Sequence, residues 1–214
     1  MHLSLWKQGL RAVPEAVWDR KDLQTLVLAD NDLTEVSDRI GELRHLRMLD
    51  LGHNKLREIP HSLGALEGLT DFLYLHDNEL AELPLSLRQL TRLRYLNISE
   101  NAFDALPEAV TEMSSLIELR VTDNHLSAVP ESICRLTRLR ELHLRNNQLT
   151  MLPDSVGLLV ELRQIDLRGN PIASLPKSLL ELPRLDKLDL RWVDTFRAPA
   201  WFAELETRGC AIYR

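Results

Sequence analysis

Side chains that commonly carry out catalysis or bind metals are few in this chain, and their spacing matches no familiar catalytic or metal-binding motif. The chain has seven histidines and two cysteines among 214 residues. It contains no His-Glu-x-x-His pair, no Cys/His cluster, no glycine-rich phosphate loop and no Gly-x-Ser-x-Gly segment. Those arrangements hold a catalytic zinc, a nucleotide or an activated serine. We therefore expect no catalytic residue, no bound metal and no cofactor.

Two histidines leave an enzymatic alternative open. His76 and His143 are predicted to lie on one exposed face, near Asp50 and Asp166. A histidine beside a carboxylate can transfer protons. Exposed polar residues on a repeated surface explain the same pattern more simply, so a hydrolase or transferase that uses this face is the remote alternative.

The elements that position these side chains follow from a repeat. The phrase Leu-x-x-Leu-x-Leu-x-x-Asn recurs every 23 or 24 residues, a period and pattern typical of leucine-rich repeats. Its asparagines are Asn31, Asn54, Asn78, Asn101, Asn124, Asn147 and Asn170. A carboxamide can both donate and accept hydrogen bonds, so we expect these side chains to satisfy the backbone where each coil turns away from its strand. They are predicted to be structural rather than binding residues.

Each repeat predicts one strand and one helical turn. Leu-x-Leu has the alternation of a half-buried strand. An apolar-Pro step follows, with apolar residues spaced by three, which favours a short helical or 3-10 turn because proline fixes φ and needs no hydrogen-bond partner for its nitrogen. Stacked coils would form an α/β solenoid with a parallel sheet on the concave face and the helical turns on the convex face.

The whole chain resembles the leucine-rich repeats with the unit LPxxLxxLxxLxxLxLxxNxL, as residues 83–103 show. This subfamily includes Ras-group scaffolds and many bacterial intracellular proteins. The resemblance implies a right-handed horseshoe that recognises a protein partner, commonly through the concave sheet, without a cofactor. Small GTPases are partners of some members, but no motif in this chain carries that partner over.

The repeat extends almost from end to end, so we expect one domain over residues 1–214. An opening unit spans 1–22, seven full repeats span 23–184, and a closing unit with a cap spans 185–214. Residues 209–213 are predicted to add a last strand. The aromatic residues expected to fill the two ends of the core are Trp18, Trp192, Phe196, Trp201 and Phe202.

Two units depart from the pattern. Ser37 replaces the proline of the first full repeat, which predicts a looser turn. The repeat that ends at Asn78 carries one extra residue. An extra residue at a strand predicts a bulge that changes the direction of neighbouring side chains, which here are Phe72 and Tyr74.

The positions beside the buried leucines predict the exposed face of the sheet. Apolar and aromatic side chains gather there on three consecutive predicted strands: Met48, Phe72, Tyr74, His76 and Tyr95. Such side chains are typical of the centres of interfaces, so we interpret them as a protein-binding surface.

Polar and basic residues continue that surface. They are Asn97, Arg120, His143, Arg145, Arg168 and Arg191. Nearby acidic residues balance part of this charge, and a solvated ladder of ion pairs explains the arginines slightly better than a binding site does.

Composition narrows the class of partner. The net charge is −6, from 26 basic and 32 acidic residues without a basic cluster, so nucleic acid and an anionic membrane are not expected as partners. No signal peptide or long apolar run is visible, and two isolated cysteines suit a reducing compartment. We expect a cytoplasmic, bacterial, non-catalytic interaction scaffold that is a monomer or self-associates weakly. The alternative is an effector delivered into a host cell.

Overall fold

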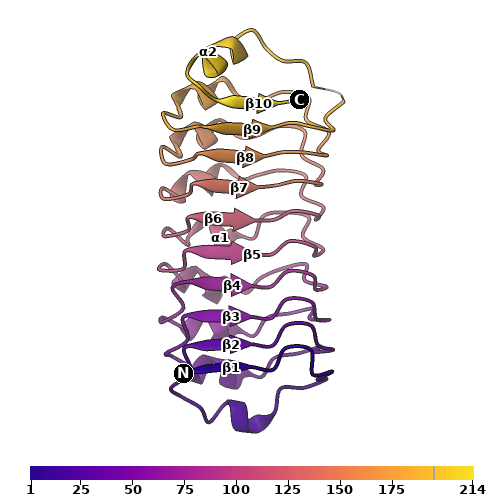
Figure 1. Cartoon of the computed structure of the whole chain (residues 1–214), viewed down its shortest axis with the longest axis vertical. Helices are drawn as coiled ribbons and strands as arrows, with labels where there is room; N and C mark the ends of the chain where they lie inside the picture. The colour runs from indigo at the N-terminus through magenta and orange to yellow at the C-terminus, as the bar shows by residue number, and fades with distance from the viewer. Residues whose placement is uncertain (195) are drawn as a thin grey trace.

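The computed structural model describes residues 1–194 and 196–214 and shows one elongated stack of coils (Figure 1). Ten described strands of three residues each form one parallel sheet, in the order in which they occur in the chain. They are β1 His2–Ser4, β2 Thr25–Val27, β3 Met48–Asp50, β4 Phe72–Tyr74, β5 Tyr95–Asn97, β6 Glu118–Arg120, β7 Glu141–His143, β8 Gln164–Asp166, β9 Lys187–Asp189 and β10 Ala211–Tyr213. The predicted α/β solenoid with a parallel sheet is confirmed.

Short helices lie on the side of each coil opposite the sheet (Figure 1). They are η1 Glu15–Val17, η2 Asp38–Glu42, η3 His61–Ala65, η4 Leu85–Gln89, α1 Glu108–Thr111, η5 Glu131–Arg135, η6 Asp154–Leu158, η7 Lys177–Glu181 and α2 Phe202–Thr207. Proline directly precedes most of them, with φ −64° at Pro60 and −63° at Pro84, because its fixed φ suits the start of a helical turn. Within the described chain, none of these helices has the length and apolar character needed to cross a membrane.

Ser37 does more than replace a proline. Its Oγ accepts a hydrogen bond of 3.2 Å from the backbone N–H of Arg39 and thereby caps η2. A side-chain cap satisfies one of the free N–H groups at the start of a helix. The turn at Ser37 was predicted to be looser than the others, but the serine side chain caps it.

One apolar core runs through the stack. The leucines of Leu-x-Leu point inward and are fully buried, as at Leu49, Leu96 and Leu119. No single coil could enclose these side chains alone, so neighbouring coils supply the rest of the apolar environment.

The asparagines form the predicted hydrogen-bonded ladder. Asn101 donates from Nδ2 to the carbonyls of Leu75 at 3.0 Å, Ile98 at 3.2 Å and Ser99 at 3.0 Å. Its Oδ1 accepts from the backbone N–H of Leu80 at 3.0 Å. Each such asparagine therefore joins its own coil to the preceding one.

The extra residue before Asn78 does not disturb its strand. β4 pairs in regular register with both β3 and β5. The surplus is taken up just before the strand, where Asp71 N–H donates to the Arg47 carbonyl at 2.9 Å and Arg94 N–H donates to the Thr70 carbonyl at 3.1 Å. The prediction that Phe72 and Tyr74 change direction was wrong, because the neighbouring strands hold β4 in place.

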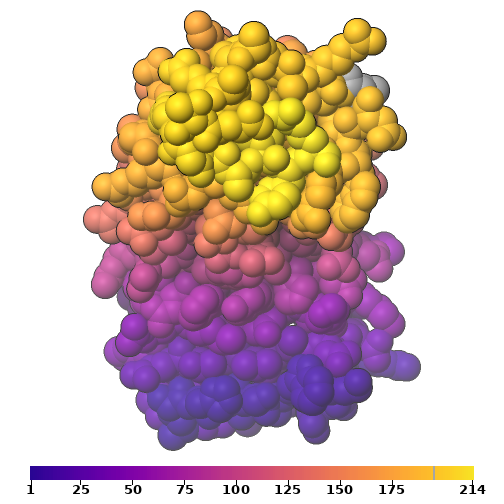
Figure 2. Space-filling view, turned by 45° about the horizontal axis from the view of Figure 1, so that its top comes forward, coloured from indigo at the N-terminus to yellow at the C-terminus, as the bar shows by residue number. Residues whose placement is uncertain are grey.

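The C-terminal coil closes the stack as predicted. β10 pairs with β9 through Ile212 opposite Leu188, and the last coil with α2 covers the end of the molecule (Figure 2). Phe202 is buried, while Phe196 and Trp201 are half-buried against the core. At the other end of the chain, Trp18 is also buried.

Trp192 is a correction to the predicted set of core aromatics. Its side chain is 64% exposed. The residue has a φ of 63°, at the turn position that Asp30 and His53 occupy in earlier coils. That turn directs the side chain to solvent, where it lies against the guanidinium groups of Arg168 and Arg191.

Candidate functional site

The predicted site residues lie on the outer face of the sheet. Met48 pairs with Phe72, and Phe72 pairs with Tyr95, so these three side chains form one row across β3, β4 and β5. Tyr74 lies opposite Asn97 in the neighbouring row. In-register residues of parallel strands share a face, and the regular register therefore places all of these side chains together.

Ring contacts join the three largest side chains into one surface. The ring centroids of Tyr74 and Tyr95 are 5.0 Å apart, and those of Phe72 and Tyr95 are 5.5 Å apart. Phe72 and Tyr74 are stacked at 5.9 Å. We call Met48, Phe72, Tyr74, His76 and Tyr95 the aromatic cluster. Phe72 is its most exposed aromatic ring, with 42% of its surface accessible.

A hollow of about 400 Å³ adjoins this cluster. Phe72 and Tyr95 form its apolar wall, while Arg47, Asp71 and Glu118 supply charged groups. Arg47 and Asp71 are paired at 3.2 Å. The surface thus combines an aromatic wall with polar groups at its margin, as interface centres commonly do.

The tyrosine hydroxyls are held in their neutral form. Burial raises the pKa of Tyr74 above its ordinary value and the pKa of Tyr95 to about 12. Both groups therefore remain hydrogen-bond donors at neutral pH. A neutral phenol gives an apolar ring with one polar edge, which suits contact with another protein.

His76 extends the cluster on one side. Its ring lies directly over Gly52, where a side-chain Cβ would collide with it, and its centroid is 4.7 Å from that of His53. Burial lowers the pKa of His76, with the neighbouring His53 acting in the same direction. Asp50 accepts a hydrogen bond from the Gly52 backbone at 3.0 Å. Among the described residues, Nδ1 of His76 is buried without a hydrogen-bond partner, and no hydrogen bond joins His76 to Asp50.

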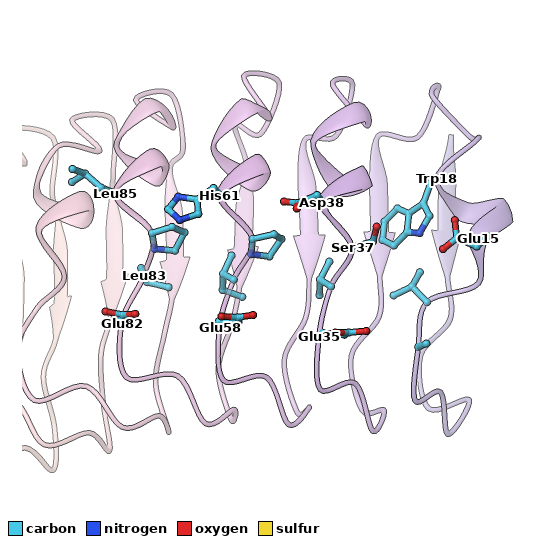
Figure 3. Close-up of a pocket in the computed structure, with 16 residues that line it drawn as sticks. Glu15, Trp18, Glu35, Ser37, Asp38, Glu58, His61, Glu82, Leu83 and Leu85 are labelled. Atoms are coloured by element: carbon cyan, nitrogen blue, oxygen red, sulfur yellow. The ribbon is translucent and has the colours of Figure 1, made fainter.

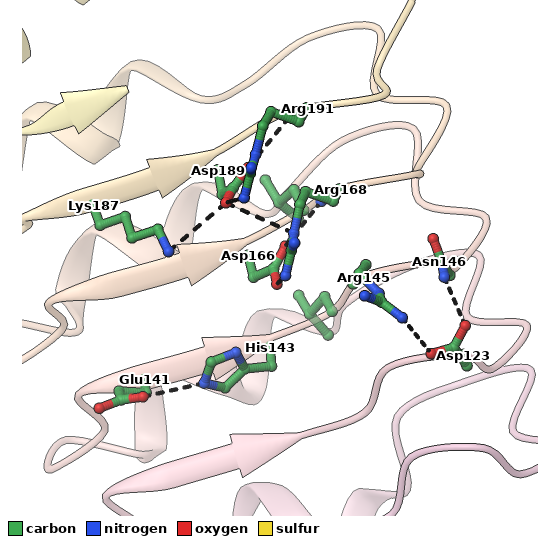
Figure 4. Close-up of polar contacts among 12 residues, drawn as sticks. Asp123, Glu141, His143, Arg145, Asn146, Asp166, Arg168, Lys187, Asp189 and Arg191 are labelled. Carbon is green, nitrogen blue, oxygen red and sulfur yellow. Dashed lines mark hydrogen bonds and ion pairs between the residues drawn. The ribbon is translucent and has the colours of Figure 1, made fainter. Parts of the chain in front are cut away.

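The arginines of the sheet face are neutralised by carboxylates (Figure 4). Arg168 pairs with Asp166 at 2.6 Å, and Arg191 pairs with Asp189 at 2.8 Å. Asp189 is fully buried. Although burial raises its pKa, hydrogen bonds from Arg191 hold the pKa below its ordinary value.

The other two arginines of the predicted surface are also paired with carboxylates. Arg120 lies 2.5 Å from Glu118, and Arg145 lies 3.4 Å from Asp123. These pairs match the predicted ladder, and they leave little free positive charge for an anionic ligand.

Sequence reasoning missed one candidate ligand set. Glu118 and Glu141 stand directly opposite each other on β6 and β7, and His143 lies 3.8 Å from Glu118 and 3.2 Å from Glu141. The ligand atoms of this trio lie within 4.8 Å of one another. The in-register glutamate pair in the sequence could have indicated it. Arg120 already binds a Glu118 oxygen, so a cation would have to displace that arginine.

Two family models match the chain, and both describe repeats of this kind. One, a leucine-rich repeat region, matches residues 35–131. The other, a leucine rich repeat, matches residues 137–192. Together with the stacked coils and the asparagine ladder, these matches show that the chain belongs to the leucine-rich-repeat proteins. A comparison with curated proteins found no match.

Solved structures share the same architecture. A leucine-rich-repeat protein of Leptospira interrogans is 27% identical with a TM-score of 0.78, and the match covers 98% of this chain and 64% of that one. The plant peptide hormone receptor RGFR1, solved in complex with RGF2, is 30% identical with a TM-score of 0.77, covering 92% of this chain and 32% of the receptor chain. This chain spans less than two thirds of the lengths of the Leptospira protein and the plant receptor.

A third structure shows the fold alone. The leucine-rich-repeat domain of the type III effector XopL is 24% identical with a TM-score of 0.81, and the match covers 99% of this chain and 75% of that one.

Proposed function

We propose that this protein is a non-catalytic interaction scaffold that binds a protein partner on its concave face, with the aromatic cluster at the centre of the contact. The observation that carries the proposal is the joining of Phe72, Tyr74 and Tyr95 across two adjacent strands, with Phe72 left exposed. Leucine-rich-repeat proteins commonly act as interaction scaffolds, and RGFR1 was solved with a bound peptide.

The physical basis is the apolar surface that the cluster leaves in water. Covering it would release about 25 cal/mol for each Å² removed from solvent. The rings already contact one another and are held by paired strands, so little conformational entropy is lost when a partner binds. The partner that fits best presents apolar or aromatic side chains with hydrogen-bond acceptors for the tyrosine hydroxyls.

The compartment is part of the same proposal. Cys210 is buried, Cys134 is half-buried, and both are free thiols. Burial raises the pKa of Cys210 to about 11, which keeps that thiol protonated and unreactive. These features support a reducing, cytoplasmic setting. That the cell is bacterial is proposed because a leucine-rich-repeat protein of Leptospira interrogans is among the similar structures. The role of an effector in a host cell would use the same surface.

The direct test replaces Phe72, Tyr74 and Tyr95 together by alanine and measures binding of the partner recovered with the unmodified protein. We expect the dissociation constant to rise at least about 100-fold, because clustered aromatic residues commonly dominate interface energies. The thermal midpoint should fall by only a few degrees, since the three side chains face outward.

A matched control replaces three polar residues on the same face by alanine: Thr25, Thr122 and Gln164. This control should change the dissociation constant by less than about twofold. Unchanged binding by the aromatic variant, or an equal loss in both variants, would remove the aromatic cluster from the proposed interface.

A further inference from the structure

A second surface lies away from the sheet, along the flank of the first four coils. A groove of about 750 Å³ is lined in each coil by the residues that directly precede and open the helices η1 to η4 (Figure 3). It shares no residue with the aromatic cluster. A ligand in this groove would therefore leave the concave face free.

Three carboxylates line one side of the groove. Glu35, Glu58 and Glu82 occupy the same position in three successive coils, two residues before Ser37 or the equivalent proline. Adjacent coils are spaced like adjacent strands, so these carboxylates repeat about every 5 Å. No ion pair involving any of the three is found among the described residues.

The basic residues nearest to Glu58 in sequence are already paired elsewhere. Lys55 lies 2.6 Å from Asp32, and Arg57 lies 2.8 Å from Glu79. The groove as a whole is lined by five carboxylates and by no lysine or arginine. One of the five, Glu15, is paired with Arg39 at 3.0 Å. Like charges in register repel one another, so the other four carboxylates give this flank negative charge that the described part of the fold leaves uncompensated.

The fold itself does not require acidic residues at this position. In the later coils the same position is occupied by uncharged residues, namely Ala105, Ala128, Met151 and Ser174. These coils form the same strands and helical turns as the earlier ones. The acidic row is therefore a property of the N-terminal flank and not of the repeat.

The floor of the groove is apolar and contains an unused hydrogen-bond donor. Val13, Val36, Ile59 and Leu83 line it and are almost completely buried. Trp18 also lines the groove (Figure 3) and is 1% exposed. Its Nε1–H has no acceptor among the described residues. A buried donor without an acceptor is costly, and the carbonyl of a bound chain would relieve that cost.

We propose that this groove binds an extended, basic peptide segment of a protein partner. Four coils span about 15 Å, which matches four or five residues of extended chain. Alternate side chains of such a segment point to one side, about 7 Å apart. Lysine or arginine at alternate positions would reach the row of Glu35, Glu58 and Glu82. Apolar side chains between them would contact the floor, and a backbone carbonyl would accept from Trp18.

The test measures binding of a fluorescein-labelled synthetic peptide of about nine residues, in which lysine alternates with valine, by fluorescence anisotropy at low salt. The variant Glu35→Gln/Glu58→Gln/Glu82→Gln keeps the shape of the groove and removes its row of charge. We expect its dissociation constant to rise about tenfold, equivalent to about 1.4 kcal/mol.

A matched control variant removes the same charge from helices outside the groove: Glu108→Gln, Asp154→Asn and Glu181→Gln. It should alter the dissociation constant by less than about twofold. The alanine variant of Phe72, Tyr74 and Tyr95 should bind the peptide normally. In methyl NMR spectra, the Ile59 signal should move on addition of the peptide while the Ile165 signal stays in place.

Several results would overturn the proposal. One is equal weakening in the control and groove variants, which would show attraction to net charge alone. Another is loss of binding in the aromatic variant, which would place the peptide on the sheet. A third is equal binding of a peptide in which glutamate replaces lysine. Displacement of the peptide by calcium at micromolar concentration would instead identify the row as a cation site.

Discussion

At the residue scale, one carboxamide closes each coil of the stack. Asn101 forms four hydrogen bonds with backbone groups in the interior that would otherwise have no partner. We expect Asn101→Ala to lower the free energy of unfolding by about 3 kcal/mol, because it leaves buried donors and acceptors without hydrogen-bond partners. Urea unfolding measures this loss. The control Asn97→Ala, on the sheet face, should cost less than about 1 kcal/mol; equal losses would contradict the structural role of the ladder.

His76 makes a residue-scale prediction about pH. Burial lowers its pKa in the folded protein below the ordinary value of 6.5, so the unfolded chain binds the proton more tightly. The stability that neutral His76 contributes is therefore complete above about pH 6.5 and decreases as the pH falls below it. We expect the unmodified protein to lose more unfolding free energy between about pH 7.5 and pH 5.5 than His76→Gln does. Parallel losses in chemical denaturation would argue against a buried neutral imidazole.

At the scale of the element, the start of each helical turn is held either by proline or by a side-chain cap. Ser37 has φ −60° and ψ 143°, close to the values at Pro60 and Pro84. We expect Ser37→Ala to destabilise the protein by about 1 kcal/mol through loss of the cap. Ser37→Pro should be nearly neutral, because the lost cap is offset by lower entropy of the unfolded chain. Thermal unfolding distinguishes the two variants. A larger loss of stability for Ser37→Pro than for Ser37→Ala would contradict the view that proline and the serine cap serve equally well at this position.

The elements could be predicted from the sequence because each coil repeats one local pattern. Leu-x-Leu defines the strand, and the apolar-Pro step defines the turn. Trp192 and the extra residue before β4 could not be predicted, because both depend on how adjacent coils align. A turn with φ of 63° exposes Trp192, and paired neighbours keep β4 in register.

The candidate site was predictable to the same extent. Period-two alternation places Phe72 and Tyr95 on one face, and equal repeat lengths bring them into register. The partners of charged groups could not be predicted as well. His143 was expected near Asp166, but it forms a hydrogen bond with Glu141. Such choices depend on rotamers and local distances that a repeat pattern does not encode.

At the scale of the whole molecule, the stack is uniform inside and uneven outside. The core and the asparagine ladder continue from coil to coil. The aromatic cluster and the acidic groove both belong to the N-terminal half, on different sides of the same coils. The C-terminal half of the sheet instead carries internally paired charges. A scaffold with this distribution can present two chemically different surfaces on one rigid support.

The central claim is that the aromatic cluster is the contact surface for a protein partner. Photo-crosslinking in cells that naturally produce the protein tests it most directly, with benzoylphenylalanine introduced either at Phe72 or at Leu158. Leu158 is also an exposed apolar residue, 63% accessible, but it lies in η6 on the opposite side of the coil. We expect a discrete crosslinked protein from position 72 and none from position 158. Crosslinking from position 158 alone, or from neither position, would contradict the account.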